Sequence, residues 1–90
     1  MAHKIAFIGA GSFGFTRSLV RDLLSFPAFN DAEIALMDIN AERLDSITRA
    51  VKRIVEAGNY PAKVVSTMDR AEALKGAKGV VTTILHGDVD

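Results

Sequence analysis

The sequence alternates between short apolar runs and longer segments in which apolar residues recur every three or four positions. The first run, 5–8, lies between Lys4 and Gly9 and predicts a strand that is buried on both faces. Three more strands are predicted, at 33–38, 63–67 and 79–85. Strands separated by helices pair in parallel through right-handed crossovers. We therefore predict an α/β fold built on a parallel sheet.

Helical spacing fills the two longest gaps between these strands. The first helix is predicted from Phe13 to near Pro27, and its buried face is expected to comprise Phe15, Leu19, Val20, Leu23 and Leu24. The second is predicted to begin after Asn40, a good N-cap residue. Its expected end is Gly58-Asn59, which favours a left-handed stop.

A short third helix is predicted from Asp69 to about Lys75. Asp69 and Glu72 have the spacing of a capping box, in which each side chain accepts a hydrogen bond from the other residue's amide. Gly76 is expected to close the helix before the last strand.

Composition limits the partners of such a domain. Eleven basic and eleven acidic residues cancel, so the chain has no broad positive field for nucleic acid or an anionic membrane. The absence of cysteine excludes disulfides and thiolate metal ligands from this stretch and is consistent with the cytoplasm. The run 5–8 is too short for a signal peptide or a membrane span. We expect one cytoplasmic domain that binds anions only locally.

The segment 9–14, Gly-Ala-Gly-Ser-Phe-Gly, follows the first predicted strand and opens the first helix. Gly9 can form the tight turn, Gly11 lets the backbone approach a pyrophosphate, and Gly14 is expected to allow close packing of helix on strand. Free amides and the helix dipole there attract phosphates. The pattern predicts the first half of a doubly wound, Rossmann-type dinucleotide-binding domain with strand order 3-2-1-4.

An acid at the end of the second strand completes the pattern. Asp38 lies 29 residues after Gly9, where a carboxylate accepts hydrogen bonds from both ribose hydroxyls and repels a 2′-phosphate. NAD is therefore favoured over NADP, although Arg43 is close enough in sequence to leave NADP open. Besides the three glycines and Asp38, the predicted cofactor contacts are Ser12, Phe13, Ile39 and Thr83.

The remaining polar candidates have simpler interpretations. His86, after the last strand, either touches the nicotinamide ribose or substrate, or is a solvated loop histidine. Asp88 and Asp90 have no histidine or cysteine partner and are interpreted as solvated rather than as metal ligands. Tyr60 is assigned no catalytic role. No catalytic or metal-ligating residue is predicted in the chain.

Several segments together resemble the N-terminus of glycoside hydrolase family 4, closest to its α-galactosidase and α-glucosidase branch. They are 4–12, 15–16, 19–24, 34–39, 42–45 and 73–81. Members are several times longer, so the resemblance implies that residues 1–90 are the NAD-binding segment of a longer enzyme. Gly-Ala-Gly at 9–11 and Leu-Met before Asp38 differ from the phospho-glycosidase branch and imply unphosphorylated sugars. Segment 86–90 departs from the family's usual Val-Gly-Gly loop and leaves the sugar open, uronic acid glycosides included.

The resemblance also implies an unusual hydrolytic mechanism. A hydride leaves C3 of the sugar for NAD, a base removes the acidified C2 proton, the aglycone is eliminated, water adds and the hydride returns. A divalent metal, typically manganese, would be held by a cysteine and histidines beyond residue 90. The isolated chain is expected to be inactive and to form homo-oligomers. Two alternatives stay open: an NAD-dependent dehydrogenase of the lactate or malate type, and a stand-alone NAD-binding module.

Overall fold

The computed structural model describes residues 3–11 and 13–82, without the side chain of Phe13. The elements in chain order are β1 (Lys4–Ile8), α1 (Phe13–Leu24), β2 (Glu33–Met37), α2 (Ala41–Ala57), β3 (Lys63–Thr67), α3 (Arg70–Leu74) and β4 (Gly79–Thr82). All strand pairs are parallel and the sheet order is β3-β2-β1-β4, which confirms the predicted fold class and topology. The predicted extension of the last strand to residue 85 lies outside the described residues.

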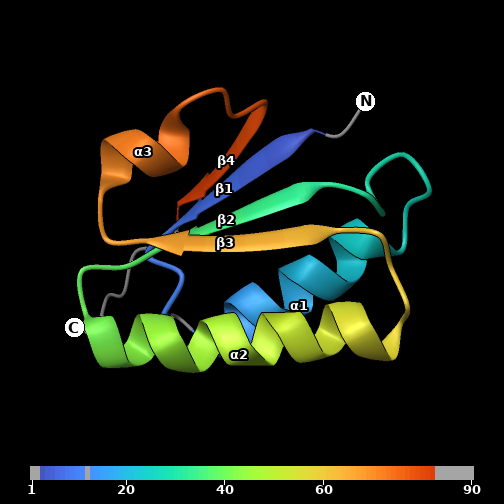
Figure 1. Ribbon diagram of the computed structural model, residues 1–90, viewed down its shortest axis with the longest axis horizontal. Coiled ribbons are helices and arrows are strands. Elements are labelled where there is room, and N and C mark those ends of the chain that lie inside the picture. The colour runs from blue at the N-terminus through green and yellow to red at the C-terminus, as the bar shows by residue number, and fades with distance from the viewer. Residues whose placement is uncertain (1–2, 12, 83–90) are drawn as a thin grey trace.

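Helices cover the two faces of the sheet unequally. Figure 1 shows α1 and α2 on one side and the short α3 on the other. Ile5 and Phe7 of β1 join the main core with the two long helices, whereas Ala6 contributes to a smaller cluster with Met37 and Ala73 of α3. This alternation follows from the two-residue period of a strand. None of the helices in the described part of the chain is long and apolar enough to cross a membrane.

The buried face of α1 differs from the predicted one at its first turn. Val20 and Leu24 are buried as expected, but Phe15 is 51% exposed. Thr16 is fully buried instead, and its hydroxyl donates a hydrogen bond of 2.9 Å to the carbonyl of Ala10. The start of α1 packs against the preceding turn rather than against apolar side chains, so a hydroxyl that binds a buried carbonyl is favoured there.

The ends of α1 and α2 show where the local predictions were right and where they were wrong. The α1 helix ends at Leu24, earlier than the predicted end near Pro27. At the start of α2 the Asn40 side chain accepts a hydrogen bond of 2.9 Å from the Arg43 amide, which confirms the cap. At its far end Asn59, with φ of 54°, takes the left-handed conformation, whereas Gly58 stays right-handed at φ −88°.

The predicted capping box at α3 is wrong. Asp69 caps the helix by accepting from the Ala71 amide at 3.0 Å. The Asp69 amide donates to the hydroxyl of Thr67, and Glu72 accepts from that same hydroxyl instead of reaching the amide. The Thr67 hydroxyl thus hydrogen-bonds both the Asp69 amide and the Glu72 carboxylate, which a capping box would have joined directly.

Candidate cofactor site

The glycine-rich turn ties the end of β1 to the end of β2. Gly9 has φ of 79°, the left-handed region that favours glycine, which confirms its predicted turn role. The amides of Gly9 and Ala10 both donate to the carbonyl of Met37, at 2.9 and 2.8 Å. The turn therefore places the start of α1 beside the carboxyl end of β2.

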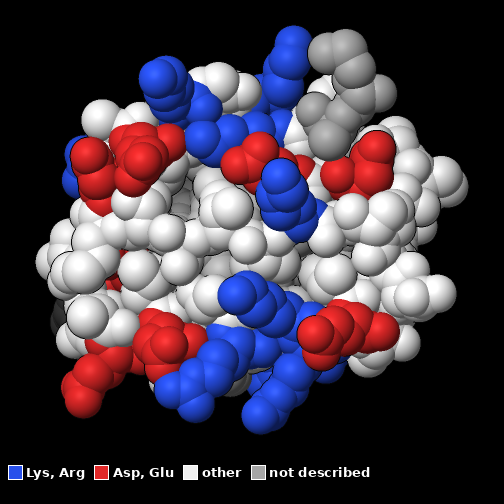
Figure 2. All heavy atoms as spheres, viewed as in Figure 1, with Lys and Arg blue, Asp and Glu red and all other residues white. Residues whose placement is uncertain are grey.

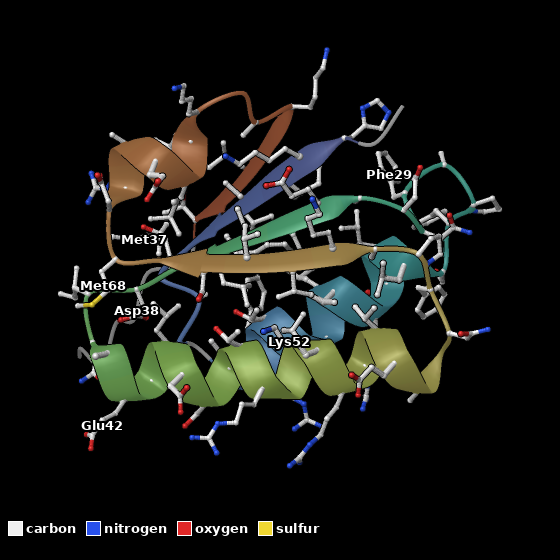
Figure 3. The ribbon with its side chains drawn as sticks, in the orientation of Figure 1. Phe29, Met37, Asp38, Glu42, Lys52 and Met68 are labelled. Carbon is white, nitrogen blue, oxygen red and sulfur yellow. The ribbon has the colours of Figure 1, made fainter. Side chains whose placement is uncertain are left out.

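Asp38 is the first residue after β2, and only 4% of it is exposed. Its Oδ2 accepts a hydrogen bond of 2.8 Å from the Gly11 amide, and its Oδ1 accepts one of 2.8 Å from the Asn40 amide. The Arg43 guanidinium lies 3.7 Å from Oδ1. In Figure 3, Asp38 lies at the end of the sheet where α2 begins. Both carboxylate oxygens are thus oriented by backbone amides before any ligand arrives.

A shallow groove of about 290 Å³ opens next to Gly11 and Arg43, the two residues that contact the Asp38 carboxylate, and Asp38 itself does not line it. Gly11, Glu42, Arg43 and Ser46 line it, so it lies between the glycine turn and the first turns of α2. Ligands of doubly wound sheets bind outside the carboxyl ends of the strands. A carboxylate has about four lone-pair sites, so Asp38 keeps acceptor capacity for ribose hydroxyls beyond its two amide bonds. The residues present therefore fit the adenosine ribose of a dinucleotide.

Gly11 has protein neighbours that the sequence did not predict. A Cβ added at this position would lie 2.5 Å from Asp38 Oδ2 and 2.9 Å from the Cβ of Arg43. The sequence predicted that glycine leaves room for a pyrophosphate. In the structure it also leaves room for the carboxylate that the Gly11 amide contacts.

Gly14 does not have its predicted packing role. It is exposed, and a Cβ added there would meet nothing within 4 Å in the described part of the chain. The residue lies on the first turn of α1, and no described residue packs closely enough on it to require a glycine here.

We expect Gly14→Ala to raise the free energy of unfolding by about 0.5 kcal/mol, because alanine loses less backbone entropy in a helix. Urea denaturation of both proteins measures this difference. Gly11→Ala is the matched control and should be destabilising, since its Cβ collides with Asp38. A destabilised Gly14→Ala protein would mean that unseen packing exists at this turn.

The other predicted contacts stand as follows. Ile39 follows Asp38 in sequence, and its side chain is 78% exposed, so it is not part of the protein core. Ser12, Thr83 and His86 lie outside the described residues, as does the side chain of Phe13. Arg43 entered the sequence argument only as a reason to leave NADP open, and its contact with Asp38 needed the structure to be seen. Among residues 3–11 and 13–82, no three His, Cys, Asp or Glu side chains form a group that could hold a metal ion.

The sheet order, the glycine turn after β1 and the buried acid after β2 together define a dinucleotide-binding domain of the Rossmann type. A more specific assignment comes from comparison with known proteins. The chain belongs to glycosyl hydrolase family 4, whose family model matches residues 4–90.

Individual relatives agree with this assignment. An α-galactosidase of Rhizobium meliloti (strain 1021) is 44% identical over 97% of this chain and 18% of its own length. A solved 6-phospho-α-glucosidase from gut microorganisms, in complex with NAD and glucose-6-phosphate, superposes with a TM-score of 0.85 at 27% identity over 98% of this chain and 20% of its own. The chain spans about a fifth of the length of the curated relatives it matches.

The fold is also shared with dehydrogenases. A lactate dehydrogenase of Cryptosporidium parvum, complexed with lactic acid and NAD, superposes with a TM-score of 0.68 at 24% identity, over 93% of this chain and 25% of its own. At this identity the likeness extends to the fold alone.

Proposed function

We propose that residues 1–90 form the NAD-binding segment of a longer family 4 α-glycosidase that acts on unphosphorylated sugars. The observation that carries the proposal is the buried Asp38 carboxylate, 2.8 Å from the Gly11 amide at the carboxyl end of the sheet. The 44% identity to an α-galactosidase, against 27% to the 6-phospho-α-glucosidase, supports the unphosphorylated substrate.

Three parts of the site would hold NAD. Asp38 would accept hydrogen bonds from the adenosine ribose, and its neighbour Arg43 would line the adjoining groove together with Gly11. The pyrophosphate would lie at the start of α1, where the first amides of a helix have no intrahelical partner and the helix dipole is positive. The amides of Gly9 and Ala10 are engaged by Met37, so they hold the turn rather than the ligand.

Bound NAD would supply a reversible hydride acceptor for C3 of the sugar. The base and the ligands of a divalent metal, Mn²⁺ in our proposal, would come from other parts of the longer enzyme. We therefore expect the 90-residue chain to bind NAD without glycosidase or dehydrogenase activity. A cytoplasmic location and a homo-oligomeric parent enzyme are part of the same proposal.

Calorimetric titration of the chain with NAD and with NADP tests the cofactor assignment. NAD should bind at least about ten-fold more tightly, because each hydrogen bond to a charged group contributes about 1.5–3 kcal/mol and Asp38 repels a 2′-phosphate. Equal affinities would remove Asp38 from its assigned role. No binding of either cofactor to a folded chain would contradict the proposal.

A further inference from the structure

A second hollow lies at the opposite end of the long helices from Asp38. It has a volume of about 670 Å³ and is lined by Arg17 and Arg21 of α1, by Ala50, Arg53, Ile54 and Ala57 of α2, and by Gly58 and Tyr60 of the turn before β3. All strands are parallel, so the start of β3 marks the edge of the sheet opposite to the carboxyl ends. The hollow, which we call the helix groove, is therefore separate from the cofactor site.

The helix groove concentrates positive charge. Among the described residues that line it, three are arginines and none is acidic. Figure 2 shows basic side chains gathered along the lower part of the view, over α2, with acidic ones to either side. The chain has no net charge, so this excess is local.

Two of these arginines are not neutralised within the described chain. Arg49 of α2 is paired with Asp45, but the guanidinium groups of Arg21 and Arg53 form no hydrogen bond or ion pair with any described residue. They line one hollow and come from different helices, α1 and α2. A multiply charged oxyanion bound by both residues would balance their charge and accept hydrogen bonds from both guanidinium groups.

The floor of the groove is apolar and its shape depends on one glycine. Tyr60 and Ile54 pack against the main core cluster beneath it. A Cβ added at Gly58 would lie 2.1 Å from Cε2 of the Tyr60 ring. Since Gly58 has φ of −88°, any residue could adopt its backbone conformation. Glycine is therefore needed here for space, so that the Tyr60 ring can lie over the turn.

We propose that the helix groove binds a small organic phosphate, with the phosphate between Arg21 and Arg53 and an apolar or aromatic body over Ile54 and Tyr60. The volume lies within the range of small-molecule pockets. A phosphate matches the charge because it brings up to two negative charges and three acceptor oxygens to one point. This site is independent of the proposed function, which stands if the site fails.

Phenyl phosphate is the probe, because it combines a phosphate with an aromatic ring and has no adenosine that could enter the cofactor site. NMR titration of the 90-residue chain should shift the signals of Arg21, Arg53 and Tyr60 and leave those of Gly11 and Asp38 unchanged. Inorganic phosphate should bind the same residues more weakly. Shifts centred on Gly11 and Asp38 would overturn the proposal.

The phenyl phosphate affinities of arginine variants distinguish a specific binding site from general electrostatic attraction. Arg53→Ala and Arg21→Ala should each weaken phenyl phosphate about ten-fold, as expected for loss of a charge-assisted hydrogen bond at a partly exposed site. Arg70→Ala removes an exposed arginine at the start of α3, on the other side of the sheet, and should leave the affinity unchanged. Equal losses in all three variants would mean an adventitious ion only.

Gly58→Ala tests the apolar floor of the helix groove, because the added Cβ would displace the Tyr60 ring. The variant should remain folded by circular dichroism, lose the advantage of phenyl phosphate over inorganic phosphate, and retain inorganic phosphate binding. Retention of the full advantage would contradict the role of the Tyr60 ring. The groove could instead be occupied by a second copy of the chain, and light scattering across a dilution series tests this. A dimer that Arg53→Ala dissociates would assign the groove to the second copy and overturn the proposal.

Discussion

Gly11→Val is expected to abolish measurable NAD binding and to lower the free energy of unfolding by about 1–3 kcal/mol, the usual cost of overpacking. The Cβ alone would lie 2.5 Å from Asp38 Oδ2, so the carboxylate has to leave the Gly11 amide. Loss of that contact separates the turn from the acid that would bind the ribose. Calorimetry with NAD and urea denaturation measure the two effects.

Gly14→Val is the stability control for this variant, since it adds the same side chain three residues later where nothing described lies within 4 Å. It should unfold at nearly the wild-type urea concentration. If Gly11→Val bound NAD normally while folded, the turn would not be the pyrophosphate site. If both variants lost stability equally, the Asp38 contact would not explain the cost.

Asp38→Ala is expected to weaken NAD by about 10- to 100-fold, which corresponds to the loss of hydrogen bonds to a charged acceptor. NADP should lose less affinity, because Arg43 would be released from Asp38 and could pair with the 2′-phosphate. The variant should also be less stable, since the amides of Gly11 and Asn40 lose their acceptor. Parallel titrations with the two cofactors measure the change in preference.

Glu42→Ala supplies the matched control. Glu42 lines the adjoining groove on the first turn of α2 but is exposed, and Figure 3 shows it pointing away from the sheet. Its removal takes away one negative charge but no ribose acceptor, so NAD affinity should be retained and the ratio of NAD to NADP affinity should change much less than in Asp38→Ala. An equal change in both variants would indicate a general effect of charge rather than a specific ribose contact.

The sequence was sufficient for the parts of the fold that depend on local pattern. Apolar runs, helical spacing and cap residues predicted every described element. The position of an acid after the second strand drew attention to Asp38, which the structure places against the Gly11 amide. Even the turn conformation of Gly9 follows from its place between a strand and a helix. These features depend on residues close together in the chain or on the regular geometry of parallel sheets.

The capping box at α3 failed on a local competitor, Thr67, but the other errors in burial and packing arose where residues distant in sequence approach each other. The different surroundings of Gly11 and Gly14 depend on where the end of β2 lies relative to the turn, which no motif specifies. The burial of Thr16 in place of Phe15 depends on which side of α1 meets that turn. Tyr60 had no visible partner in the sequence because its groove is built by two helices that meet only in three dimensions.

The two amide bonds to Asp38 would link binding of the proposed cofactor to folding. One oxygen orders the glycine turn and the other the entry to α2, so a ligand that requires this carboxylate in place binds the native chain and not the unfolded one. At a concentration one hundred times its dissociation constant, such a ligand adds about 2.7 kcal/mol to the stability of the native state. The whole stability of a domain of this size is about 5–10 kcal/mol. The concentration of dinucleotide would then strongly affect the fraction of the segment that is unfolded and therefore its lifetime.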